Sequence, residues 1–215
     1  MRNDLTELVF ILDRSGSMAG LEADTIGGFN SVLARNKELP GDAVVTTVLF
    51  DHEAQLLHDR QPIQAVLPIT SQDYYVGGST ALLDALGQSI LKVENAHAHI
   101  AEDYRPGKVQ FVIVTDGQEN ASRTWRLPAI RKLIDEHRER GWDFLFLGAN
   151  IDAIATAESM GIHRDRAVTA MSDGAGVPLQ YAAVAAANTA FRTGCPKDAS
   201  WKAAVEKDTK ARGRR

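Results

Sequence analysis

The chain has 215 residues, of which 44% are hydrophobic and 24% charged, and its formal net charge is −4. This length predicts one large domain, and the ordinary apolar content excludes a mainly disordered chain. The lone Cys195 excludes an internal disulfide, no run approaches the roughly 18 apolar residues of a membrane span, and the first ten residues lack the pattern of a signal peptide, so we expect a cytoplasmic protein that does not enter a membrane.

Apolar runs separated by turn residues predict the elements of the first half. A strand is expected over 7–12, followed by a helix whose apolar positions 26, 29, 32 and 33 share one face and which ends before Pro40. The β-branched run 43–50 predicts a second strand. Short apolar runs at 54–57 and 63–67 are expected to form a hairpin and edge strands, and a helix is expected over 81–93.

The second half alternates in the same way. The run 109–115 is apolar nearly throughout and predicts a strand covered on both faces. A charged amphipathic helix over 126–140 ends at Gly141, which suits a helix C-terminus. A strand at 144–147, a helix at 151–160, a strand at 167–171 and an alanine-rich helix at 177–191 complete a domain predicted to span residues 1–194.

Residues 195–215 are predicted to form a basic tail that is partly helical or disordered, in which Trp201 and Val205 are able to dock on the domain. The last fourteen residues carry six basic and two acidic side chains, so residues 1–201 have a net charge of −8. Because nucleic-acid binding needs a broad basic face, this acidic body argues against a nucleic-acid partner. The charges of the tail are expected to be solvated.

Strands that alternate with helices predict an α/β fold with a doubly wound, mostly parallel central sheet and helices on both faces. The C-terminal ends of parallel strands share one rim of the sheet, where ligands bind. Three segments place oxygen-bearing side chains at this rim, namely Asp13-Arg14-Ser15-Gly16-Ser17, Gly77-Gly78-Ser79-Thr80 and Thr115-Asp116-Gly117. Two carboxylates and three hydroxyls suit a hard cation, Mg²⁺ with Mn²⁺ as an alternative. Two negative charges leave such an ion able to attract a further anion.

The D-x-S-x-S spacing, the Gly-Gly-Ser-Thr loop and the Thr-Asp-Gly strand end together resemble the von Willebrand factor A (vWA) domain over residues 8–162. The resemblance is to a stand-alone intracellular member of bacterial type, and it implies a Rossmann-like sheet with one antiparallel edge strand, placed here at 63–67. It also implies that a metal-ion-dependent adhesion site is formed by Asp13, Ser15, Ser17, Thr80 and Asp116. In that family both serines bind directly, both aspartates bind directly or through water, and the threonine binds conditionally.

Each of these residues also has an ordinary structural explanation. Asp13 and Ser15 could cap the first helix, Thr80 could be a helix N-cap, and Asp116 could belong to an ordinary turn. Three such coincidences on one rim are less probable than a shared metal site.

Residues next to the motif have alternatives of the same kind. Tyr74 and Tyr75 are expected to pack under the loop or to form an aromatic wall beside the metal. Glu119 and Asn120 are expected to cap a helix or to contact a ligand, and Asn150 and Asp152 to serve as N-caps or as part of the rim. Met18 is expected to plug the loop, and His97 and His99 are poor joint metal ligands because they lie two residues apart near a helix end.

The sequence argues against catalysis. It contains neither G-x-x-x-x-G-K-[ST] nor, after the first predicted strand, G-x-G-x-x-G, so no nucleotide-phosphate loop is expected. Ser15 is not the serine of a nucleophile elbow, because residue 13 is Asp where that motif requires Gly.

The predicted function is therefore a metal-dependent protein–protein interaction in which a partner protein offers a Glu or Asp to the cation. The resemblance implies a separate ring-shaped ATPase or a stress-response protein as the kind of partner. A small metal-dependent hydrolase or phosphatase is the alternative.

Overall fold

A computed structural model describes residues 1–149, 151–195 and 198–212. Within these residues, six strands form one sheet in the order β3-β2-β1-β4-β5-β6, in which only β3 runs antiparallel to its neighbour. The strands are β1 (Arg2–Asp13), β2 (Asp42–Phe50), β3 (Ala54–Pro62), β4 (Pro106–Thr115), β5 (Asp143–Ala149) and β6 (Ala167–Ala170). The α-helices are α1 (Glu22–Lys37), α2 (Leu82–Ala98), α3 (Leu127–Glu139), α4 (Ala153–Ser159), α5 (Gly176–Thr193) and α6 (Ala203–Arg212).

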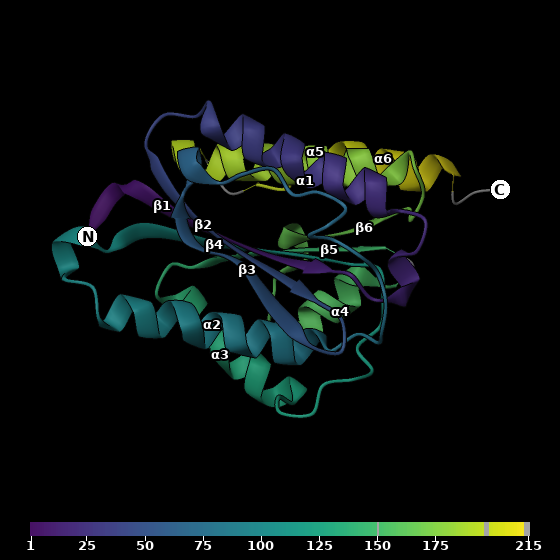
Figure 1. Cartoon of the computed structure of the whole chain (residues 1–215), viewed down its shortest axis with the longest axis horizontal. Helices are drawn as coiled ribbons and strands as arrows, with labels where there is room; N and C mark the ends of the chain where they lie inside the picture. Colours follow the sequence, from purple (N-terminus) through teal and green to yellow (C-terminus); the bar gives the residue numbers. More distant parts are fainter. Residues whose placement is uncertain (150, 196–197, 213–215) are drawn as a thin grey trace.

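The helices form two layers, with α1, α5 and α6 on one face of the sheet and α2, α3 and α4 on the other (Figure 1). Alternate residues of β1 serve the two layers, because successive side chains of a strand point to opposite faces. Leu8, Phe10 and Leu12 belong to the core under α1 and α5, whereas Val9 and Ile11 belong to the core under α2 and α3. The predicted mostly parallel sheet with helices on both faces is confirmed.

The antiparallel edge strand lies earlier in the chain than predicted. It is β3, which runs through Pro62, and the predicted strand at 63–67 is wrong because Ile63–Ala65 form a 3₁₀ turn. In a strand, Ile63 and Val66 would point to opposite faces, whereas i and i+3 of a 3₁₀ turn share one side. Both side chains are buried in the core that contains α1. The run 63–67 is too short for a helical period to show in the sequence, so it predicts a strand.

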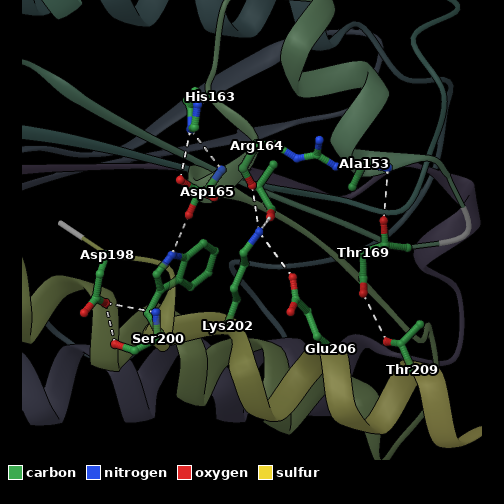
Figure 2. A network of polar contacts seen from close by, with 12 residues as sticks. Ala153, His163, Arg164, Asp165, Thr169, Asp198, Ser200, Lys202, Glu206 and Thr209 are labelled. Carbon is green, nitrogen blue, oxygen red and sulfur yellow. Dashed lines mark hydrogen bonds and ion pairs between the residues drawn. The ribbon is translucent and has the colours of Figure 1, made fainter.

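The chain beyond α5 packs on the domain. A 3₁₀ turn over Ser200–Lys202 leads into α6, and Trp201 and Val205 are both buried against the core that contains α5. Figure 2 shows how side chains of this segment meet the backbone around β6, with Thr209 donating to the carbonyl of Thr169 over 3.1 Å. The division of the chain at residue 195 stays a prediction. Among the described residues, no helix has both the length and the apolarity needed to cross a membrane.

Two adjacent glycines in α1 allow a matched test of how α1 and α5 pack. A Cβ on Gly28 would lie 2.6 Å from Cγ of Tyr181 on α5, whereas a Cβ on Gly27 would meet nothing within 4 Å. Gly28→Ala is therefore expected to lower the unfolding free energy by about 1–3 kcal/mol through overpacking. Gly27→Ala is expected to raise it by about 0.5–1 kcal/mol, because alanine loses less entropy in a helix. Thermal unfolding of both variants checks this, and equal shifts would contradict the close α1–α5 contact.

Candidate metal centre

The first two motif segments are joined by backbone hydrogen bonds at the end of β1. The N–H of Gly16 donates to the carbonyl of Gly78 over 3.1 Å, and the N–H of Gly77 donates to the carbonyl of Arg14 over 2.9 Å. Gly78 has a φ of +72°, and a Cβ there would lie 2.5 Å from Nδ1 of His52. The second segment therefore needs glycine for both its conformation and its close approach.

Side-chain hydrogen bonds tie the first segment to the third. The hydroxyl of Ser17 donates to Oδ1 of Asp116 over 2.5 Å, and the hydroxyls of Ser15 and Ser17 lie 3.0 Å apart. Asp13 accepts on both oxygens, from the N–H of Ser15 at 2.7 Å and from the hydroxyl of Thr115 at 2.5 Å. Four of the five predicted site residues thus belong to one hydrogen-bonded group.

The fifth residue, Thr80, joins them beside Gly117. A Cβ placed on Gly117 would lie 2.6 Å from Oγ1 of Thr80, 3.2 Å from Oγ of Ser17 and 3.4 Å from Oγ of Ser15. Three hydroxyl oxygens from two segments therefore surround one point that a side chain would otherwise fill. Thr80 is held there because its N–H donates to Oδ1 of Asn120 and its carbonyl accepts from the N–H groups of Asn120 and Ala121.

Both carboxylates at this rim are almost fully buried, with Asp13 1% and Asp116 4% exposed. Burial raises the pKa of Asp13, and the nearby negative charge of Asp116 raises it further, although hydrogen bonds from Thr115 and Ser15 act in the opposite direction. Because these two buried carboxylates repel each other, a bound cation would stabilise the arrangement.

Four of the five predicted ligands line a cavity of about 290 Å³. Its lining comes from all three motif segments, from two residues after the third segment and from one residue after β5: Ser15, Gly16, Ser17, Gly78, Ser79, Thr80, Asp116, Gly117, Gln118, Asn120 and Ile151. Nowhere in the described part of the chain do three or more His, Cys, Asp or Glu side chains gather in a way that could hold a metal. The set of two carboxylates and three hydroxyls therefore fits a hard cation that prefers oxygen, rather than a nitrogen- and sulfur-bound ion.

The two tyrosines beside the second segment have different roles. Tyr74 is buried and its hydroxyl donates to the carbonyl of Asp13 over 2.6 Å, so it packs under the loop. Tyr75 is 56% exposed, and the guanidinium of Arg14 lies 4.7 Å from its ring centroid. Met18 is buried, as expected of a residue that plugs the loop.

Of the residues after the third segment, Glu119 caps a helix, whereas Asn120 holds the loop before that helix and lines the cavity. Oδ1 of Asn120 accepts from Thr80, and Oε2 of Glu119 accepts from the N–H of Leu83 in the first turn of α2. Asp152 caps α4 by accepting from the N–H of Ala155. Asn150 lies outside the described residues.

Two further hydroxyls of the site were not among the predicted ligands. Thr115 is buried and bonds to Asp13, and Ser172 donates to Oδ2 of Asp116 over 3.2 Å. Thr115 points to the rim from the last position of β4. Ser172 follows β6, so the rule that ligands gather at the C-terminal ends of parallel strands could have indicated it.

Neither a family model nor a curated protein matches the sequence, but solved structures share its fold. Proximal thread matrix protein 1 from the mussel byssus, solved with a zinc-occupied MIDAS motif, aligns with a TM-score of 0.53 and 17% identity over 79% of this chain and 42% of its own. A von Willebrand factor type A protein from Catenulispora acidiphila aligns with a TM-score of 0.55 and 16% identity over 88% of this chain and 43% of its own.

This chain therefore spans less than half the length of those two proteins. The VWA domain of SpRpn10 aligns with a TM-score of 0.51 and 10% identity, over 81% of this chain and 92% of its own. The sheet order, the antiparallel edge strand β3 and these alignments together show that this chain has the von Willebrand factor A fold.

Proposed function

We propose that this chain is a metal-dependent protein-interaction module whose cation is held by Asp13, Ser15, Ser17, Thr80 and Asp116. The observation that supports this most is the convergence of three hydroxyls beside Gly117, next to two buried carboxylates and under an open cavity. Buried carboxylates are costly unless a positive charge compensates them. The described residues lining the cavity include no Lys, Arg or His that could do so.

The hydrogen bonds suggest how the donors divide the work. Asp13 does not line the cavity and accepts from Ser15 and Thr115, so we assign it to contact through water or to orient its neighbours. Asp116 and the hydroxyls of Ser15 and Ser17 face the cavity and are the proposed direct ligands. We favour Mg²⁺ or Mn²⁺, since all five donors are oxygens. The zinc in the MIDAS motif of the mussel protein supports a divalent cation on this fold.

A cation held there would supply a positive charge at the floor of the cavity, which two carboxylates only partly balance. A Glu or Asp of a partner protein fits this charge, because a carboxylate forms strong charge-assisted contacts in a partly desolvated cleft. Asp116 is the only ionisable residue among the described cavity-lining residues, so they offer no separate general base. This supports binding over the hydrolase or phosphatase alternative. The proposal places the module in the cytoplasm, where its lone cysteine would stay reduced.

Partner capture should depend on the cation. In crosslinking pull-downs, we expect a partner to be recovered in Mg²⁺ and lost on chelation or in Asp116→Ala, because truncating a buried charged contact costs about 2–5 kcal/mol. Asp103→Ala is the matched control, since Asp103 is exposed in the turn before β4, at the opposite end of the sheet. Equal capture in Mg²⁺, in chelator and by Asp116→Ala would contradict a metal bridge. Turnover of a phosphoester that is lost in Asp116→Ala would instead favour the enzyme alternative.

A further inference from the structure

Both carboxylate oxygens of Asp116 accept a hydrogen bond, and one of the two donors lies outside the motif. Ser17 donates to Oδ1 over 2.5 Å, and Ser172 donates to Oδ2 over 3.2 Å. Ser172 lies in the loop between β6 and α5, about 55 residues beyond the third motif segment. The fold brings it to Asp116 because both residues follow the C-terminal ends of strands in the same sheet. A donor on each oxygen fixes the rotation of a carboxylate, which decides where its remaining lone pairs point.

The residue after Ser172 anchors this loop. Oδ1 of Asp173 accepts from the N–H groups of Ala175 and Gly176, over 3.0 and 2.8 Å, at the start of α5. Oδ2 of the same carboxylate accepts from Nη1 of Arg212 over 2.5 Å. Both oxygens of Asp173 are therefore engaged, one by α5 and one by α6.

Arg212 is presented to Asp173 by the last turn of α6. Its Nε donates to Asp208, four residues earlier, over 2.8 Å, and its Nη2 pairs with the same carboxylate. The ion pair with Asp208 within α6 orients the guanidinium of Arg212 toward Asp173. The side chains of Arg212 and Asp173 are partly exposed, so the ion pair contributes little to global stability.

Helix α6 is attached by one buried side chain and by several polar contacts. Val205 is its only buried residue among those described. Besides the Arg212–Asp173 ion pair, Thr209 donates to the carbonyl of Thr169, and Lys202, just before the helix, donates to the carbonyls of Ala167 and Arg164 over 2.9 and 2.7 Å (Figure 2). Several contacts therefore attach α6 to the domain, and each of these contacts depends on one side chain.

These contacts form one path from the C-terminal helix to the candidate metal site. We propose that Ser172 is a positioning residue of that site, which orients the carboxylate of Asp116, and that α6 holds Ser172 in place through the Arg212–Asp173 ion pair. The proposal rests on the proposed function only in that Asp116 binds a cation, and it needs no partner protein. It gives the C-terminal segment a role in tuning cation affinity.

The test is a titration of the whole chain with Mn²⁺, in which the electron paramagnetic resonance signal of free Mn²⁺ measures how much is bound. Ser172→Ala is expected to raise the dissociation constant about tenfold, the lower end for residues that orient metal ligands. Ser172→Thr keeps the hydroxyl and should restore binding. Arg212→Ala should raise the constant about two- to fivefold, the size of weak coupling through a contact network. Lys210→Ala removes the same charge from α6, where no ion pair of Lys210 is found with the described residues, and should leave the constant unchanged.

A second measurement separates positioning from simple loss of structure. Hydrogen exchange should quicken at the amides of Ala175 and Gly176 in Arg212→Ala but not in Lys210→Ala, while the melting temperature without metal stays close to that of the original chain. Unchanged Mn²⁺ binding in Ser172→Ala would overturn the proposal, and equal effects of Arg212→Ala and Lys210→Ala would overturn the role of α6. If the unmodified chain takes up no Mn²⁺, both this proposal and the proposed function fail. If the unmodified chain binds Mn²⁺ and Ser172→Ala binds it equally well, this proposal fails and the proposed function is unaffected.

Discussion

Asp116→Ala is expected to abolish divalent-cation binding at micromolar to millimolar concentrations. This change removes one of two buried negative charges at the site, together with the acceptor for the hydroxyls of Ser17 and Ser172. Removing one partner of a buried charge pair typically costs about 3–5 kcal/mol, or a hundredfold or more in the dissociation constant. Calorimetric titration of the metal-free chain with Mg²⁺ and Mn²⁺ measures the loss directly.

The same variant should remain folded, which separates a binding role from a structural one. The lost hydroxyl contacts are offset because the charge of Asp116 no longer opposes that of Asp13. We therefore expect the stability of the metal-free chain to stay within about 1 kcal/mol, the size of one net hydrogen bond. Asp103→Ala, an equal change of charge far from the rim, should bind like the original chain. Full Mg²⁺ and Mn²⁺ binding by Asp116→Ala would show that the cation site is elsewhere.

Gly117→Ala is expected to block the site by filling it. The added Cβ would lie 2.6 Å from Oγ1 of Thr80 and within 3.4 Å of both serine hydroxyls, so one or more of them must move. Mg²⁺ binds oxygens at about 2.0–2.1 Å in near-octahedral geometry, which leaves no room for a methyl group among the same donors. We expect affinity to fall at least about a hundredfold, with a stability loss of about 1–3 kcal/mol from overpacking.

Gly77→Ala is the control for this substitution. Gly77 lies on the same rim, its φ is not positive, and a Cβ there would meet nothing within 4 Å. Its N–H bond to Arg14 should persist, so titration calorimetry should show unchanged cation binding. If Gly117→Ala bound as tightly as Gly77→Ala, the point beside Gly117 would not be where the cation sits.

The order of strands and helices could be predicted from the sequence because each core strand is long, apolar and bounded by turn residues. The runs around Leu8, Val45 and Phe111 have burial on both faces, which suppresses alternation and marks a central strand. The sequence mispredicts the segment around Ile63 because a five-residue apolar run is too short for its period to distinguish a strand from a 3₁₀ turn. Only the position of α1 above it shows which geometry buries both Ile63 and Val66.

The sequence by itself determined the chemistry of the rim. Asp13 and Asp116 were predicted to lie together because the C-terminal strand ends of a parallel sheet share an edge. The resemblance to vWA domains added Ser15, Ser17 and Thr80 to the predicted site. Tertiary structure decided how those groups engage one another. It brings Ser172 to Asp116 and Arg212 to Asp173 across long stretches of chain, and it places three hydroxyls around Gly117. Such contacts are set by the packing of β6, α5 and α6 rather than by local spacing, and therefore leave no periodic signal in the chain.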